Sequence, residues 1–152
     1  MLELRNLDKI YKLKKKNVHA VKKANLTFNR GEFVSILGLS GSGKTTLVSM
    51  IGGMEEPTGG KLVIDGMNTK RFKKSQWTDY RKNTIGFVFQ DFNLIDHLTA
   101  IDNVKIALSL SGQTEIEKEQ RAVALLTDVG MIEQRDKFPR QMSGGQQQRI
   151  AI

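Results

Sequence analysis

A glycine-rich stretch that ends in Lys-Thr carries the clearest chemistry in the sequence. Residues 38–45 read Gly-Leu-Ser-Gly-Ser-Gly-Lys-Thr and match the pattern G-x-x-x-x-G-K-[ST]. Glycines let backbone amides approach an anion, and a helix that begins there points the positive end of its dipole at the same place. Lys44 can reach the β and γ phosphates of a nucleotide, and the Thr45 hydroxyl can bind Mg²⁺. The residues expected to hold the nucleotide phosphates are Gly38, Ser40, Gly41, Ser42, Gly43, Lys44, Thr45 and Thr46.

The context of this stretch argues against an ordinary glycine-rich turn. The apolar run 33–37 precedes it and predicts a buried parallel strand, and residues 45–51 predict an apolar helix after it. A strand, a glycine loop and a helix in this order are the surroundings that a phosphate-binding loop requires.

A second glycine motif lies about a hundred residues later. Residues 142–149 read Met-Ser-Gly-Gly-Gln-Gln-Gln-Arg. Ser143 can cap a helix there, and the amides of Gly144 and Gly145 would then form another helix N-terminus suited to an anion. A capped helix with a run of polar glutamines is the alternative interpretation of this motif taken alone.

The two motifs in this order resemble those of the ATP-binding-cassette (ABC) family, whose signature is written L-S-G-G-Q and here has Met142 in place of the commoner leucine. The resemblance extends over the whole chain. Residues 85–98 are most similar to ATPases of the lipoprotein-release, macrolide-export and antimicrobial-peptide-export group. The resemblance to this family implies an ATP-binding subunit that couples MgATP binding and hydrolysis to transport or extraction of a substrate at the membrane.

The resemblance also implies roles for single residues. Tyr11 would stack on adenine, and Gln90 would reach Mg²⁺ and the attacking water, so that Lys44 and Gln90 are the expected catalytic residues. Thr45 and Gln90 would be the metal ligands. The alternatives are a tyrosine at a strand edge and a glutamine that simply ends a strand. Residues expected to contact the ATP of a second, head-to-tail subunit are Ser143, Gly144, Gly145 and Gln146.

The family's remaining catalytic residues are expected beyond Ile152. They are an Asp-Glu pair at the end of an apolar strand (the Walker B aspartate and the catalytic glutamate), a loop aspartate and a switch histidine. The 152 residues alone are therefore expected to bind nucleotide with weak or no hydrolysis, and to leave an apolar sheet edge uncovered. Low solubility or swapped assembly would follow. His97 is expected to be a surface residue on a loop facing the membrane partner.

The pattern of predicted elements indicates an α/β fold, a P-loop NTPase core with an N-terminal antiparallel β subdomain, a helical subdomain and an incomplete sheet. Residues 2–4 and 24–28 predict the antiparallel strands, and 33–37, 61–64 and 85–89 predict further strands. Helices are expected over 45–51, 75–82, 99–109 and 114–129, and from 143 onward. The expected division is 1–31, antiparallel subdomain; 32–90, phosphate-loop core; 91–142, helical subdomain; and 143–152, signature helix.

Composition limits the cellular setting. The 152 residues contain no cysteine, so a disulfide framework and a thiolate zinc site are excluded. No apolar run approaches the roughly 18–20 residues that span a bilayer. If a membrane is involved, a transmembrane permease subunit must cross it, with this chain peripheral on its cytoplasmic face. The surface 91–111 is the expected docking site for that permease.

The formal net charge is +8, with basic clusters at 12–16, 22–23, 71–74 and 81–82. Nucleic acid or anionic lipid would suit such charge, but no aromatic side chains are interleaved for base stacking. A solvated basic surface is favoured, and no nucleic-acid partner is expected.

Two other functions stay open. A soluble, non-transport cassette ATPase acting on DNA or ribosomes would need a long coiled-coil insertion or a second cassette, and the interval 90–143 is too short for such an insertion. A truncated nucleotide-binding module without hydrolysis fits the chain as well.

Overall fold

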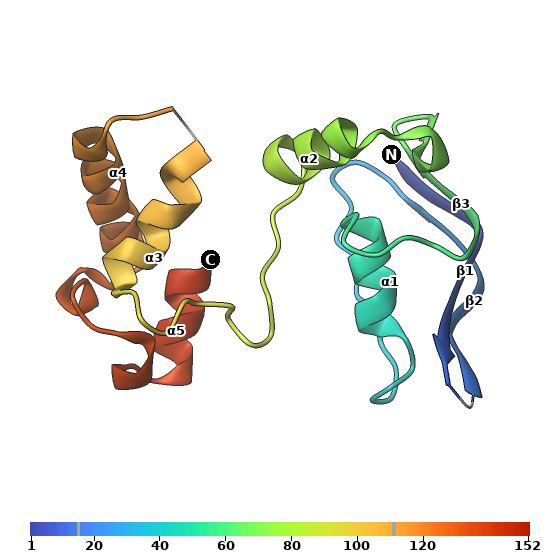
Figure 1. Cartoon of the computed structure of the whole chain (residues 1–152), viewed down its shortest axis with the longest axis horizontal. Coiled ribbons are helices and arrows are strands. Elements are labelled where there is room, and N and C mark those ends of the chain that lie inside the picture. Colours follow the sequence, from blue (N-terminus) through green and yellow to red (C-terminus); the bar gives the residue numbers. More distant parts are fainter. Residues whose placement is uncertain (15, 111) are drawn as a thin grey trace. The chain divides into compact units, whose positions relative to one another are not determined.

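The computed structural model describes residues 1–14, 16–110 and 112–152. Lys15 of the first basic cluster and Ser111 at the end of the expected docking surface lie outside the described residues. The chain divides into two compact units, Met1–Gly86 and Phe87–Ile152, coloured blue to yellow-green and yellow to red in Figure 1. Each unit is described by itself.

The first unit is built on a four-stranded antiparallel sheet with the order β2-β1-β3-β4. The strands are β1 (Leu2–Leu13), β2 (Lys16–Phe28), β3 (Gly59–Ile64) and β4 (Met67–Asn68). β1 is flanked by β2 and β3, which confirms the predicted N-terminal antiparallel sheet and the strand at 61–64. β3 turns into β4 through Asp65 and Gly66, whose φ angles of 44° and 80° are both positive, as the hairpin turns that match strand twist require.

Two helices pack with this sheet into one core. They are α1 (Lys44–Ile51) and α2 (Lys74–Asn83), with the 3-10 turn η1 (Thr69–Arg71) between β4 and α2. Trp77 has a packing role, because its ring lies edge-on to Phe72 and Tyr80 at centroid distances of 5.2 and 5.8 Å. Burial raises the pKa of the Tyr80 hydroxyl to about 12. The buried core of this unit consists of Leu4, Leu7, Val21, Leu47, Met50, Leu62, Ile64 and Tyr80.

The predicted strands at 33–37 and 85–89 are wrong. Both segments are irregular, and Figure 1 shows the first as a light-blue coil that leads into α1. Phe33 and Leu37 are 97% and 88% exposed rather than buried. A strand needs a neighbour for its backbone hydrogen bonds, and within the described residues no segment pairs with either run. Apolar side chains of the first run are therefore left in solvent, and because this run is not in a sheet, the uncovered apolar sheet edge expected from the sequence is not seen there.

The second unit is helical. Its elements are α3 (Ala100–Ala107), η2 (Leu108–Leu110), α4 (Glu115–Asp128), η3 (Ile132–Gln134), η4 (Pro139–Gln141) and α5 (Gly144–Ala151). The helices expected over 99–109 and 114–129 are present as α3 and α4, where Thr99 caps α3 and Thr114 forms a capping box with Glu117 on α4. The buried core consists of Ala100, Ile101, Ala122, Leu126, Met131, Met142 and Ile150.

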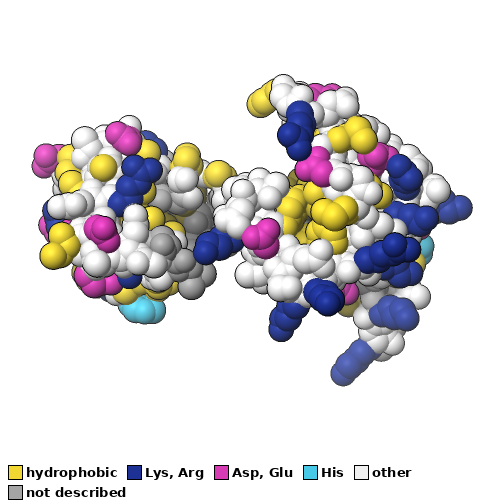
Figure 2. Space-filling model, turned by 90° about the horizontal axis from the view of Figure 1, so that it is seen from above, with side chains coloured by type: hydrophobic (Ala, Val, Ile, Leu, Met, Phe, Trp, Pro, Cys, Tyr) yellow, Lys and Arg dark blue, Asp and Glu magenta, His cyan; other side chains and the backbone are white. Residues whose placement is uncertain are grey.

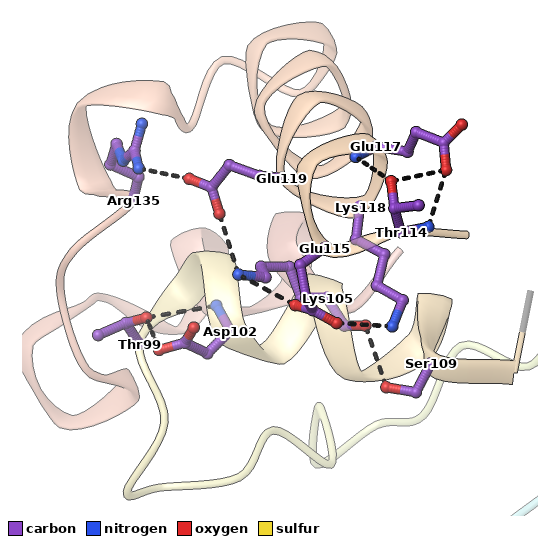
Figure 3. Close-up of polar contacts among 10 residues, drawn as sticks. All are labelled: Thr99, Asp102, Lys105, Ser109, Thr114, Glu115, Glu117, Lys118, Glu119 and Arg135. Carbon is purple, nitrogen blue, oxygen red and sulfur yellow. Dashed lines mark hydrogen bonds and ion pairs between the residues drawn. The ribbon is translucent and has the colours of Figure 1, made fainter. Parts of the chain in front are cut away.

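Charged side chains join three segments of this unit (Figure 3). Glu119 on α4 accepts from Lys105 on α3 at 3.0 Å and from Arg135, just after η3, at 2.8 Å. The hydrogen bond from Lys105, together with the charges of both cations, lowers the pKa of the Glu119 carboxyl below its ordinary value. The carboxylate therefore braces α3 against α4 only while it is ionised.

We expect this brace to weaken in acid. A carboxyl whose pKa is lower in the folded state adds stability above its unfolded pKa, and that stability disappears as the pH falls through the folded pKa. Glu119→Gln should therefore reduce the loss of unfolding free energy between pH 7 and about pH 3. Urea titrations at both pH values measure this, with Glu133→Gln as the control outside the brace. Equal acid sensitivity of Glu119→Gln and the parent chain would contradict the assignment.

Candidate nucleotide-binding site

The glycine loop 38–43 ends where α1 begins, and it curls around the ammonium group of Lys44. The Lys44 Nζ donates to the carbonyl oxygens of Gly38 and Leu39 at 2.8 and 2.7 Å, and to the Ser42 Oγ at 3.3 Å. Gly43 caps the helix in the left-handed conformation, with φ of 90°. The loop therefore holds its own cation over the point where the helix dipole begins.

The loop offers free backbone donors at this point. The Ser42 amide donates to the Leu39 carbonyl at 3.2 Å, and the helical ladder starts with the bond from Leu47 to Gly43 at 2.9 Å. In the part of the chain that the structure describes, the amides of Lys44 and Thr45 donate to no protein acceptor, as expected in the first turn of a helix. These two amides can donate to phosphate oxygens, and the positive charge of the Lys44 ammonium lies beside them, with its three N–H groups bonded to the loop.

A close contact fixes the loop against the sheet. A Cβ added at Gly43 would lie 2.0 Å from the Ala20 carbonyl oxygen in β2, so only glycine fits there. Loop, helix and strand enclose a hollow of about 320 Å³. Its walls consist of Ala20, Val21, Lys22, Ile36, Leu37, Gly38, Ser42, Gly43, Lys44 and Leu47.

Tyr11 lies near the same part of β2. It is half-buried in β1 and pairs with Val18 in β2, two residues before the loop contact at Ala20. Two residues along a strand span about 7 Å. The structure therefore brings the predicted adenine platform and the predicted phosphate loop to neighbouring positions in the first unit.

Gln90 belongs to the second unit and lies exposed in a turn. The expectation that it ends a strand is wrong, because residues 85–89 form none. The rings of Phe87 and Phe89, which precede it, instead stack at 5.3 Å. In this segment two neighbouring aromatic rings stack, and the backbone hydrogen bonds of the predicted strand are not formed.

The second glycine motif forms the predicted capped helix. Ser143 accepts from the Gln146 amide at 3.3 Å and donates its own amide to the Gln146 Oε1 at 2.8 Å, which completes a capping box on α5. Gly145 is exposed, and a Cβ added there would meet nothing within 4 Å. Packing within this unit therefore does not require a glycine at 145.

Sequence reasoning missed two side-chain amides that order this unit. Gln147 donates to the carbonyls of Pro139 and Met142 at 3.0 and 3.1 Å, which holds the segment before α5. Buried Asn103 accepts from the Ile95 amide at 2.7 Å and donates to three carbonyls of residues 95–99. Nothing local distinguishes Gln147 from its glutamine neighbours or Asn103 from a surface asparagine.

The loop held by Asn103 carries His97, which is exposed, as expected. Within residues 1–14, 16–110 and 112–152, no three His, Asp or Glu side chains gather where they could hold a metal ion. None of the described helices combines the length and the apolarity needed to cross a bilayer.

Comparison with known proteins places these features in a family. The model of the ABC transporter family matches residues 21–152. The chain is 42% identical to MJ0796 of Methanocaldococcus jannaschii, an uncharacterized ABC transporter ATP-binding protein, and 41% identical to the similarly described YvrO of Bacillus subtilis. It is also 40% identical to the methionine import ATP-binding protein MetN 1 of Enterococcus faecalis. Each alignment covers 100% of this chain.

Two solved structures of MJ0796 are similar to the chain. One is a dimeric, post-hydrolysis state of that cassette bound to ADP and Pi, with a TM-score of 0.88 at 41% identity, covering 99% of this chain and 67% of that one. The other is also dimeric, with a TM-score of 0.89, and covers 100% of this chain and 67% of that one. The chain spans 66% of the length of MJ0796 and YvrO, and 42% of MetN 1.

Proposed function

The chain belongs to the ABC transporter family, and from this we propose that the whole protein is the ATP-binding subunit of a membrane transporter, driven by binding and hydrolysis of MgATP. The observation that carries the proposal is the loop 38–43, which holds the Lys44 ammonium beside free helix amides and next to β2. Such a site binds a polyphosphate. Tyr11 pairs with Val18, which lies two residues from Ala20 in β2, and its aromatic ring suits stacking on a nucleotide base.

In the proposed site, the nucleotide lies along the first unit. Its adenine would stack on Tyr11. Its phosphate oxygens would accept hydrogen bonds from the amides of residues 38–46 and be attracted by the positive charge of the Lys44 ammonium. Thr45 would hold Mg²⁺, whose charge would neutralise the phosphates, and the family resemblance gives Gln90 the same role. Lys44 and Gln90 are the residues of this chain that would touch the reacting groups.

We further propose a head-to-tail dimer of two such subunits. The capping box of Ser143 and Gln146 begins α5, and the amides of Gly144 and Gly145 at this helix start would donate to a partner's γ phosphate. The dimeric MJ0796 structures support this assembly. The proposed parts of the chain remain 1–31, 32–90, 91–142 and 143–152.

The first unit carries most of the positive charge. Residues 1–86 contain seventeen Lys and Arg against seven Asp and Glu, whereas residues 87–152 contain seven against nine. Figure 2 shows the dark-blue side chains over the surface of the first unit. A basic surface on the unit that carries the phosphate loop raises the local concentration of a polyanionic nucleotide.

The proposed setting is the cytoplasmic face of the cell membrane, where the loop around His97 docks a transmembrane permease. The similarity of residues 85–98 favours the lipoprotein-release, macrolide-export and antimicrobial-peptide-export group.

We expect Asp91→Lys with Asp96→Lys to abolish co-purification of the whole protein with its permease, because both carboxylates are exposed on the proposed docking segment. Nucleotide affinity should change less than about twofold, since neither residue belongs to the proposed site. Pull-down and nucleotide titration on the same preparation measure the two effects. Glu133→Lys is the control for added charge, and equal loss of both activities would refute the docking surface.

The proposed function is tested by titrating the 152-residue chain with a fluorescent ATP analogue in the presence of Mg²⁺. Saturable binding that unlabelled ATP displaces is expected, without turnover, because the resemblance to the family implies that its general base and switch histidine lie outside these residues. Absence of displaceable binding would contradict the nucleotide site. Hydrolysis of ATP by the 152-residue chain alone would contradict the proposal that these residues bind nucleotide but do not complete the catalytic site.

A further inference from the structure

One lysine of the first unit is buried, and the proposed site has not yet used it. Lys9 is 9% exposed, whereas lysine side chains are almost never buried unless paired. Its Nζ forms an ion pair with the Glu55 Oε2 at 2.5 Å and donates to the Glu56 carbonyl at 2.8 Å. The same Nζ lies 5.1 Å from the ring centroid of Tyr11, within the range of a cation–π contact.

The partners of Lys9 belong to the loop that leaves α1. The amides of Met54 and Glu55 both donate to the Ser49 carbonyl, at 2.9 and 3.3 Å, so this loop is tied to the end of the helix. α1 begins at Lys44, inside the phosphate loop. An unbroken set of contacts thus runs from the phosphate end of the proposed site to the ammonium under Tyr11.

The same loop also grips the backbone of β1 on both sides of Lys9. The Thr58 amide donates to the Asp8 carbonyl at 2.8 Å, and the Ile10 amide donates to the Thr58 Oγ1 at 3.0 Å. The strand is therefore fixed to the loop at residues 8 and 10, and the ammonium of the residue between them is fixed as well. Tyr11 follows directly, so its ring has a rigid support.

We propose that Lys9 is a positioning residue that holds the Tyr11 ring for the nucleotide base and couples it to the phosphate-binding helix α1. The proposal rests on the nucleotide site proposed above. The ammonium attracts one face of the ring and limits its rotation. Because binding energies at two coupled sites are reciprocal, phosphates held at the start of α1 should bind more tightly when a base is stacked on Tyr11.

The test compares ATP with inorganic tripolyphosphate, which has the phosphates and no base. Both compete against a fluorescent ATP analogue on the 152-residue chain. Lys9→Met keeps the apolar stem and removes the charge, and should weaken ATP about fivefold while changing tripolyphosphate less than twofold. Lys9→Arg should restore most of the ATP affinity. Lys61→Met, which removes an exposed charge from β3, is the matched control and should affect both competitors equally and slightly.

Several outcomes would overturn the inference. Equal weakening of ATP and tripolyphosphate by Lys9→Met would show a purely structural role, and unchanged ATP affinity would show no role. If Lys9→Met does not fold, Glu55→Gln carries the test, since it loosens the ammonium without removing it. It should weaken ATP selectively, and no selective effect would overturn the inference. Failure of the parent chain to bind either competitor would instead refute the proposed nucleotide site.

Discussion

Lys44→Ala is expected to lower the affinity of the chain for MgATP by about ten- to a hundredfold. A hydrogen bond to a charged group contributes about 1.5–3 kcal/mol, and the ammonium of Lys44 faces the phosphates of the proposed site. A hundredfold loss corresponds to about 2.7 kcal/mol. The substitution also removes the three bonds that the Nζ makes to the loop at Gly38, Leu39 and Ser42, so the loop loses its internal support.

Two variants separate these contributions. Lys44→Arg keeps a positive charge, but its planar fork cannot reproduce the compact ammonium among three loop oxygens, so we expect an intermediate loss. Lys137→Ala removes the same charge from the second unit and should leave affinity within about twofold. Fluorescence anisotropy with a labelled ATP analogue measures all three. Affinity of Lys44→Ala within threefold of the parent chain would remove Lys44 from the site.

The parts of the fold that sequence predicts well are those with local causes. Thr114 with Glu117 and Ser143 with Gln146 satisfy amides within three residues of each other, and the local sequence predicts the first capping box and the N-cap at Ser143. Asp65-Gly66 supplies the two positive φ angles of a hairpin turn on its own. Each of these features depends on residues that are neighbours in the sequence.

The predictions of strands at 33–37 and 85–89 were wrong because strand formation does not depend on the local sequence alone. An apolar run indicates a tendency to be buried, but a strand exists only where another strand supplies its hydrogen bonds. β1 shows the opposite case, since it has a neighbour on each side and extends to Leu13, far beyond the alternating residues 2–4 that predict it. In all three segments, the presence or absence of a neighbouring strand determined whether a strand formed.

The candidate site divides in the same way. The phosphate loop and its helix follow from residues 38–45, whose order is itself the signal. The contact of Gly43 with the Ala20 carbonyl and the burial of Lys9 beneath Tyr11 join segments far apart in the chain. No spacing within either segment predicts its partner, so these supports became visible only in three dimensions.

Gly60→Ala should be the most destabilising single substitution considered for the fold. Gly60 is the second residue of β3 and has a φ of 76°, and a Cβ there would lie 2.0 Å from the Asn6 carbonyl oxygen and 2.7 Å from the Leu7 Cα. Both atoms belong to the backbone of β1, at the irregular register between Arg5 and Asp8. The strands must separate to admit the methyl group, and Leu7, fully buried, would lose its packing.

We expect a loss of about 4 kcal/mol in unfolding free energy, from backbone strain of about 1–3 kcal/mol and overpacking of about 1–3 kcal/mol. Gly31→Ala is the matched control, because its φ of 74° imposes similar strain while nothing lies within 4 Å of the added Cβ. It should cost only about 1–2 kcal/mol. Urea unfolding followed by the fluorescence of Trp77 measures both variants. Equal losses of unfolding free energy in the two variants would mean that β1 moves away from the added methyl group without a free-energy cost. Backbone strain at the glycine, and not the contact between β1 and β3, would then account for the destabilisation.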